Sequence, residues 1–283
     1  MKNFFTLLVI ILSGLLYGQS EQIIQKTTGD ESTFLNEIDS IHFNSDFTEM
    51  LVTLRSGITE SHSISNINKV TFLDSITSLY PAGTVNCNGV PTAVHDVLNP
   101  TTGKTWMDRN LGARQVAVSS DDSLGFGSLY QWGRRSDGHQ CRDSDLAFNL
   151  SSTNDPMHGD FITPIGQPFD WRSPANDNLW QGVNGINNPC PTNYRVPTEA
   201  ELEAERLSWT TNDAAGAFSS PLKFVTSNGR SANSGIIFNM GVGNYWSSNV
   251  SGSFSRNLLF LNNDAEMIDG ARASGRSVRC IKD

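Results

Sequence analysis

The stretch from Asp170 to Asn188 concentrates side chains that could bind a metal ion. Asp170, Asn176 and Asp177 bring carboxylate and amide oxygens close together in the sequence. Hard cations such as Ca²⁺ prefer oxygen ligands, and a bound ion would neutralise the two carboxylates. Asparagine and aspartate also favour turns, where their side chains bond to the local backbone. The segment therefore predicts either a calcium site or a series of turns, the turns being the simpler interpretation, and no other cofactor is expected.

Three side chains were candidates for nucleophilic catalysis. Ser128 closes the run Gly125-Phe-Gly-Ser128, but the Gly-x-Ser-x-Gly spacing that exposes a serine on a strained turn is absent. His139 stands two residues before Cys141 and could lower the pKa of that thiol. A zinc site on the same pair would need two further ligands, which no spacing supplies. We therefore expect no catalytic residue and no enzyme activity.

The aromatic side chains include six tryptophans spread along the chain. Solvent-exposed tryptophans can stack on sugar rings, although most lone tryptophans lie in a core. Trp171 and Trp180 belong to a long stretch, Ser136 to Pro189, with almost no periodicity. Because loops carry a large share of binding residues, these two tryptophans are the candidate ligand-binding side chains. Two large rings also indicate that the stretch is packed and ordered.

Charge and composition limit the partners. The chain has 29 acidic and 20 basic side chains, a net charge of −9. An acidic surface argues against nucleic acids and anionic membranes as partners. Residues 1–18 have the basic start and short apolar run of a secretory signal peptide. No later apolar run approaches membrane length. We expect an exported protein, extracellular or at the cell surface, with no membrane span in the mature chain.

The number and position of the cysteines agree with an exported protein. All four, Cys87, Cys141, Cys190 and Cys280, follow the signal segment. An even number of cysteines in an exported chain predicts two disulfides. Four cysteines allow three pairings, and their spacing alone does not choose among them.

The elements that must position these side chains fall into two regions. Residues 19–80 are expected to form a polar, mobile leader up to Thr33 and then a small β-rich unit. Its strand candidates are Ile38–Phe43, Glu49–Leu54 and Ile67–Phe72. Residues 84–283 are rich in Gly, Asn, Ser and Trp. Their strand candidates are Ala93–Leu98, Thr105–Asp108, Ile236–Met240, Asn257–Leu261 and Ser277–Ile281, with a turn at 100–103 joining the first two into a hairpin.

Two helices are predicted in the second region. Thr198 can cap a helix while Glu201, three residues on, reaches back to form a capping box, and Pro197 sets the entry. Apolar residues lie on both sides of this helix, so both faces are expected to contact protein. A second helix is predicted over Leu124–Arg134, although two glycines weaken it.

Five ordered motifs carry a family resemblance. They are Thr102-Gly-Lys-Thr-Trp-Met-Asp-Arg-Asn-Leu-Gly112, Leu129-Tyr-Gln-Trp-Gly133, Asn188-Pro-Cys-Pro191 leading to Arg195-Val-Pro-Thr198, Tyr245-Trp-Ser-Ser248, and Ser277-Val-Arg-Cys280. Residues 84–283 thereby resemble the Fibrobacter succinogenes major paralogous domain, a module of exported bacterial proteins. The small β-rich unit resembles short β segments of exported Bacteroidetes proteins.

The resemblance implies a fold and a disulfide pattern. The family is similar to the C-type lectin-like fold, which implies an α+β domain with an irregular long-loop region, here preceded by the small β-rich unit. In that fold a cysteine just before a helix pairs with one near the C-terminus, which implies Cys190 with Cys280 and leaves Cys87 with Cys141. Sugar-binding members use a Glu-Pro-Asn or Gln-Pro-Asp triplet together with Trp-Asn-Asp, and this chain has neither.

These observations predict an exported, non-enzymatic recognition or adhesion module that binds a glycan or a surface protein. Two alternatives remain open at this point. One is a cysteine-dependent enzyme related to the formylglycine-generating group, which shares the broad fold and needs a reduced cysteine. The other is a structural cell-envelope protein.

Overall fold

The chain forms two compact units, residues 1–74 and 75–283. The computed structural model describes residues 21–26, 29–34, 38–46, 48–54, 58–73, 79–238 and 241–283. The predicted signal peptide, residues 1–18, lies outside the described residues. No helix in the described part is long and apolar enough to cross a membrane.

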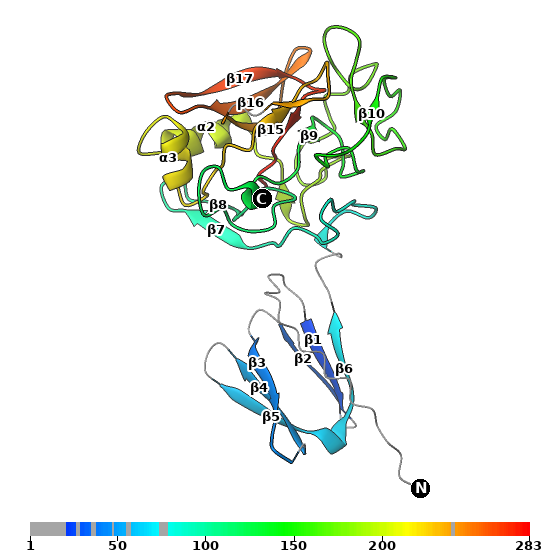
Figure 1. The fold of residues 1–283 in the computed structure, drawn as a ribbon, viewed down its shortest axis with the longest axis vertical. Helices are drawn as coiled ribbons and strands as arrows, with labels where there is room; N and C mark the ends of the chain where they lie inside the picture. Colours follow the sequence, from blue (N-terminus) through cyan, green and yellow to red (C-terminus); the bar gives the residue numbers. More distant parts are fainter. Residues whose placement is uncertain are drawn as a thin grey trace. The chain divides into compact units, whose positions relative to one another are not determined.

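The first unit contains two antiparallel sheets of three strands each (Figure 1). One has the order β2-β1-β6 and the other the order β3-β4-β5. Their bounds are β1 Glu21–Lys26, β2 Gly29–Phe34, β3 Ile38–Phe43, β4 Glu49–Leu54, β5 Thr59–Ser63 and β6 Ile67–Leu73. The short 3-10 helix η2, Ile64–Asn66, joins the two sheets between β5 and β6. The three strands predicted from the sequence are confirmed as β3, β4 and β6.

The predicted mobile leader is wrong for residues 21–34. These residues form β1 and β2, and β1 pairs along its whole length with both β2 and β6. Polar composition suggested a loop, but strand formation depends on pairing with neighbouring strands more than on intrinsic preference. The pairing partner β6 lies more than forty residues away in the sequence, with Glu21 opposite Leu73.

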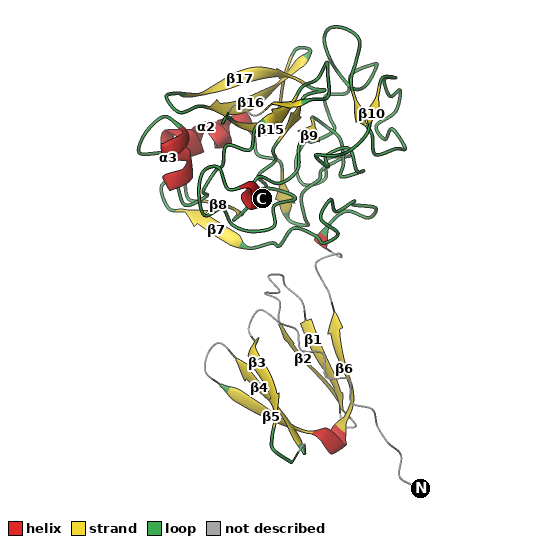
Figure 2. Ribbon diagram, in the orientation of Figure 1, coloured by secondary structure: helices red, strands yellow, loops and turns green. Residues whose placement is uncertain are grey.

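Among its described residues, the second unit contains short strands and two short α-helices joined by long loops (Figure 2). Its sheets have the orders β12-β19-β8-β7, β14-β13-β18-β9, β15-β16-β17 and β10-β11. The bounds are β7 Asp96–Asn99, β8 Lys104–Met107, β9 Tyr130–Gln131, β10 Leu146–Ala147, β11 Phe161–Ile162, β12 Tyr194–Arg195, β13 Gly229–Arg230, β14 Ile237–Phe238, β15 Gly243–Ser251, β16 Phe254–Phe260, β17 Ala265–Ala271, β18 Gly275–Arg276, β19 Ile281–Lys282, α2 Glu199–Leu207 and α3 Ala214–Ser219. This mixture is compatible with the predicted α+β class.

The two ends of the second unit meet in one sheet. The predicted hairpin is confirmed, because β7 and β8 pair antiparallel across residues 100–103. The C-terminal strand β19 lies between β8 and β12. The predicted strand Ser277–Ile281 is mostly wrong: only Ile281 belongs to β19, and the residues before it connect β18 to β19. Because the C-terminal strand pairs with a strand near the start of the second unit, the fold of this unit depends on contacts between residues far apart in the sequence.

The helix α2 begins where the sequence predicted. Thr198 Oγ1 accepts from the backbone N–H of Glu201, and the Glu201 carboxylate accepts from the backbone N–H of Thr198, which completes the capping box. The expectation that both helix faces contact protein is wrong. Leu202 and Glu205 are buried while Leu207 is 67% exposed, because α2 packs on one side only, against β15, β16 and β17 (Figure 1).

The helix predicted over Leu124–Arg134 does not form. The segment contains the 3-10 helix η3, Ser123–Gly125, and then the strand β9. Gly127 has φ +70°, and a Cβ there would lie 2.4 Å from the carbonyl oxygen of Leu111. A glycine with left-handed backbone conformation, packed this closely, interrupts the helix. The apolar residues of the segment therefore lie in a loop and in β9.

Two disulfides close the second unit, and they join Cys87 to Cys141 and Cys190 to Cys280. These are the pairs that the resemblance implied. Cys190 and Cys280 belong to a core cluster with Trp132, Trp180 and Trp246. Cys87, in contrast, is exposed. The two bridges therefore differ mainly in burial.

We predict that removing the buried bridge is the more damaging change. In the entropy model both bridges restrict the unfolded chain by roughly 4–5 kcal/mol, because their sequence separations are 90 and 54 residues. Cys190→Ala/Cys280→Ala also leaves a void in the core, which adds about 2 kcal/mol. Thermal unfolding should show a lower Tm for this double variant than for Cys87→Ala/Cys141→Ala. Equal or reversed Tm values would contradict this ranking.

Candidate functional site

The irregular stretch predicted as an ordered long loop is the candidate site. We call residues 136–189 the loop region. Its regular structure is limited to the parallel pair β10 and β11 and an isolated parallel bridge between Ser151 and Arg172. With so few strand ladders, the backbone polar groups of the loop region need side chains as partners.

Arg134, directly before the loop region, provides many of these partners. It is fully buried. Its guanidinium donates to Asp137 Oδ2 at 2.7 Å and to Gln131 Oε1 at 2.8 Å. It also donates to the carbonyl oxygens of Asp160 at 2.9 Å and His158 at 3.1 Å. A buried charge is tolerated only when it is paired and hydrogen-bonded, so Arg134 fixes both ends of the 137–160 segment.

His139 belongs to the same buried network. Its Nδ1 lies 2.5 Å from Asp137 Oδ1, and its Nε2 accepts from the backbone N–H of Gln131 at 3.0 Å. Burial, aided by the nearby charge of Arg134, lowers the pKa of His139 to about 4. Burial opposes the charge of Asp137, but His139 and Arg134 outweigh it and hold the pKa of that carboxyl below its usual range. Both imidazole nitrogens are occupied, so His139 has a structural role.

The catalytic candidates are not assembled into a reactive site. Cys141 is bonded to Cys87, so His139 has no thiol to activate, and all four cysteines are in disulfides. Ser128 is buried, and its hydroxyl donates to Cys87 Sγ at 3.5 Å. A serine nucleophile needs a base within hydrogen-bond reach, and this hydroxyl faces a disulfide.

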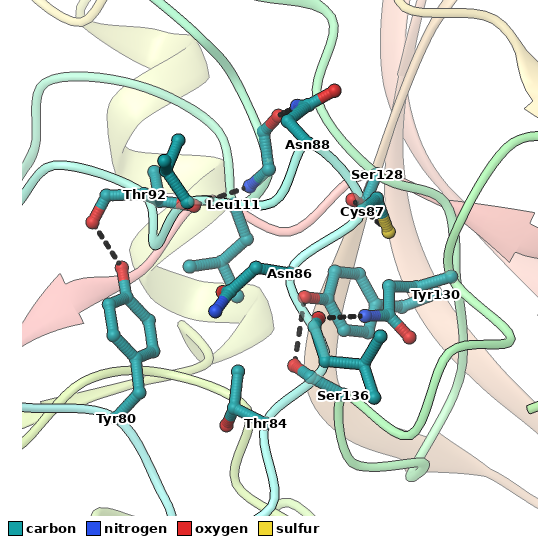
Figure 3. A pocket seen from close by; sticks show the side chains of 14 residues that line it. Tyr80, Thr84, Asn86, Cys87, Asn88, Thr92, Leu111, Ser128, Tyr130 and Ser136 are labelled. Atoms are coloured by element: carbon teal, nitrogen blue, oxygen red, sulfur yellow. Dashed lines mark hydrogen bonds between the residues drawn. The ribbon is translucent and has the colours of Figure 1, made fainter. Parts of the chain in front are cut away.

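A small hollow lies beside the Cys87–Cys141 bridge (Figure 3). The phenol of Tyr80 donates to the carbonyl oxygen of Thr92 at 2.9 Å, and the hydroxyls of Tyr130 and Ser136 lie 3.0 Å apart. The Asn86 side chain points into the space between them. The hollow has a volume of about 20 Å³, room for about one water molecule. A sugar ring does not fit there.

The prediction that Trp171 and Trp180 are exposed ligand-binding residues is wrong. Trp171 is 1% exposed and Trp180 is 0% exposed. The indole N–H of Trp171 donates to the carbonyl oxygen of Trp132 at 2.6 Å, and that of Trp180 donates to the carbonyl oxygen of Asn187 at 3.0 Å. The loop region folds over these rings because burying them stabilises a segment with little regular structure. Neither ring can stack on a sugar.

The predicted calcium ligands Asp170 and Asp177 face an arginine. Arg272 Nη2 lies 2.7 Å from Asp177 Oδ1, and Nη1 lies 3.7 Å from Asp170 Oδ2. Arg272 is 1% exposed and stacks over the ring of Trp132 at 4.9 Å. The guanidinium of Arg272 supplies these two carboxylates with the positive charge that was expected from Ca²⁺. Within the described residues, no group of three or more His, Cys, Asp or Glu side chains is arranged to hold a metal ion.

The same segment shows the turns that the alternative interpretation predicted. Asp170 Oδ1 accepts from the backbone N–H of Arg172 at 3.1 Å, and Asn176 Oδ1 accepts from the backbone N–H of Asn178 at 3.0 Å. Asn176 Nδ2 also donates to Asn154 Oδ1 at 3.0 Å. Burial raises the pKa of Asp170. The oxygen-rich composition therefore serves local hydrogen bonding.

The exposed apolar side chains of the loop region were missed in the sequence analysis. Leu146, Phe148 and Leu150 are 38%, 62% and 45% exposed, and we call these three residues the apolar edge. Further along, Met157 is 85% exposed and Ile165 is 93% exposed. The alternation of apolar and other residues in Leu-Ala-Phe-Asn-Leu150 could have revealed them, because this pattern is typical of a strand with one apolar side. Exposed apolar groups gathered in one region mark interaction surfaces.

Comparisons with protein-family models, with curated proteins and with solved structures found no significant match.

The buried histidine predicts a pH dependence of stability. Because the pKa of His139 falls from 6.5 to about 4 on folding, the unfolded chain binds one more proton between these values. The stabilisation is complete above pH 6.5 and is lost as the pH falls toward 4, by about 3 kcal/mol in all. Urea unfolding of the wild type and His139→Gln across this range should show a shallower pH dependence in the variant. An identical slope in both proteins would contradict the buried neutral histidine.

Proposed function

We propose that this protein is an exported, non-enzymatic recognition or adhesion module that binds a surface protein through the loop region. The observation that carries the proposal is a loop region hydrogen-bonded to the buried Arg134 with six large apolar side chains exposed, while every tryptophan is buried. These six are Leu146, Phe148, Leu150, Met157, Ile165 and Ile186.

The arrangement of the second unit supports a C-type lectin-like fold of the Fibrobacter succinogenes major paralogous domain type. Cys190 comes just before a capped helix and is bonded to Cys280 near the C-terminus. The C-terminal strand β19 pairs with β8 near the start of the unit. An irregular stretch then lies outside the sheets, as the long loop does in that fold. These features agree with the five motifs that suggested the family.

Export is supported by the disulfides and the N-terminal sequence together. Two bridges persist in oxidising compartments and are rare in the cytosol. The basic start and apolar run of residues 1–18 suit a secretory signal.

A protein partner fits the exposed surface better than a glycan. Sugar sites use exposed aromatic rings beside polar groups, and each of the six tryptophans is at most 9% exposed. Phe148 is the large aromatic side chain that the loop region leaves open, and its sequence neighbours at alternate positions are leucines. Aliphatic side chains grouped around one aromatic anchor are typical of the centre of protein interfaces.

The experiment is a binding screen with a matched pair of variants. The full mature chain would be applied to an array of bacterial and host surface proteins and to a glycan array. The test variant is Leu146→Ser/Phe148→Ser/Leu150→Ser. The control is Leu98→Ser/Val118→Ser/Leu207→Ser, which changes side chains that are 55%, 77% and 67% exposed outside the loop region.

We expect a reproducible protein binder that the test variant binds at least tenfold more weakly, because central apolar contacts are each worth more than about 1 kcal/mol. The control should bind as the wild type does. No binder in either format, or equal losses in both variants, would contradict the proposal.

A further inference from the structure

The apolar edge lies on a segment whose backbone is paired on one side. The N–H of Phe161 donates to the carbonyl oxygen of Asp145 at 2.7 Å, and the N–H of Thr163 donates to that of Ala147 at 2.7 Å. At the far end, the N–H of Ser151 donates to the carbonyl oxygen of Trp171 at 3.0 Å. Residues 145–148 thus run as an extended segment next to β11, and the chain bends at Asn149 before Ser151 pairs with Arg172.

Among the described residues, no further strand pairs with the opposite side of this segment. In the parallel register of β10 and β11, Ala147 directs its N–H and C=O toward β11, so Leu146 and Phe148 direct theirs to the other side. In the part of the chain that the structure describes, the backbone groups of Leu146 and Phe148 on that side have no hydrogen-bond partner. An open strand edge is a template for pairing with another chain.

Further apolar groups adjoin the apolar edge. Leu146 packs on Gly235, where an added Cβ would lie 2.3 Å from Leu146 Cδ2 and 3.2 Å from the Cγ2 of Thr163. The next residue, Ile236, is 67% exposed, and Ile165 lies two residues after Thr163. A strand placed along the open side would therefore meet apolar groups as well as free backbone groups.

The exposed charges next to the apolar edge in the chain are negative, whereas the nearby cation Arg230 is buried and donates to the carbonyl oxygens of Ser144 and Gly235. The loop region contains seven Asp, no Glu, no Lys and two Arg. Both arginines are occupied by carbonyl oxygens, Arg142 by those of Gly127 and Ser227 and Arg172 by that of Pro174. Asp143 and Asp145 are exposed, and neither forms a salt bridge within the described residues. They lie directly before Leu146 in the chain.

We infer that the apolar edge accepts a basic, strand-forming polypeptide segment, which adds as a further strand beside residues 145–148. This inference rests on the proposed function and names the chemistry of its partner. Backbone hydrogen bonds to Leu146 and Phe148 would hold the segment, and alternate apolar side chains would cover the apolar edge. Lysine or arginine on the segment would pair with Asp143 and Asp145. A second copy of the chain is disfavoured there, because its own residues 145–150 contain no lysine or arginine to pair with these carboxylates.

Synthetic peptides test this directly. The first probe is a ten-residue peptide of alternating Val and Lys, and the second has Glu in place of Lys. The third is the Val-Lys peptide with an N-methyl group on every residue, which removes the N–H donors from both edges. Fluorescence anisotropy with the full mature chain would measure the affinity of each peptide at low and high salt.

We expect the Val-Lys peptide to bind at least tenfold more tightly than the other two. Asp143→Asn/Asp145→Asn should weaken it severalfold and flatten its salt dependence, whereas the control Asp121→Asn/Glu266→Gln should not. Phe148→Ser should weaken it at both salt concentrations. Equal binding of the Val-Lys and Val-Glu peptides, or undiminished binding of the N-methylated peptide, would overturn strand addition.

The two proposals fail in different ways. If the arrays yield a protein that needs the apolar edge but the Val-Lys peptide does not bind, the proposed function stands and strand addition is wrong. If neither the arrays nor the peptides give a binder, both are overturned.

Discussion

The burial of one positive charge, on Arg134, constrains the arrangement of the loop region. Removing a guanidinium from water costs several kcal/mol unless its donors are satisfied. Arg134 satisfies them with Gln131, Asp137 and the carbonyl oxygens of His158 and Asp160. Its guanidinium also lies 5.6 Å from the ring of Trp171. Residues 158–160 therefore have to lie next to Arg134, and this requirement constrains where the irregular segment 137–160 lies.

Other buried arginines of the second unit also combine hydrogen bonds with an aromatic ring, in places that lack long strand ladders. Arg272 stacks over Trp132 at 4.9 Å, Arg230 over Phe161 at 4.3 Å and Arg279 over Phe224 at 5.0 Å. In each case the aromatic face accepts the cation while at least one guanidinium nitrogen donates to a carbonyl oxygen. Arg230, for example, donates to the carbonyl oxygens of Gly235 and Ser144. Because the tryptophan rings and several arginines are used inside, the exposed side chains of the loop region are aliphatic groups, Phe148, aspartates and uncharged polar residues such as Asn149 and Gln167. The buried rings and arginines thereby support the proposed recognition surface from below.

Local signals in the sequence predicted local structure well. The capping box at Thr198 and Glu201 and the hairpin around 100–103 need only neighbouring residues, and both are present. The apolar pattern also predicted β3, β4 and β6, although β6 pairs with a distant strand. The disulfide pairs came from the family resemblance, since four cysteines alone allow three pairings. Burial of Trp171 and Trp180 could not be predicted, because their partners Trp132 and Arg134 lie about forty residues away in the sequence. The oxygen-rich segment suggested calcium for the same reason: nothing near Asp170 in sequence shows that Arg272 supplies the charge.

Amide hydrogen exchange tests the central claim, that the buried Arg134 holds the loop region in one conformation. The comparison is between the wild type, Arg134→Met, which keeps most of the side-chain volume without the guanidinium, and the control Arg114→Met at an exposed position. The account predicts that amides within residues 137–163, such as those of Phe161 and Thr163, lose protection by at least tenfold in Arg134→Met, while the amides of β15 and β16 keep theirs. Unchanged protection of the loop region in Arg134→Met, or the same loss in Arg114→Met, would contradict it.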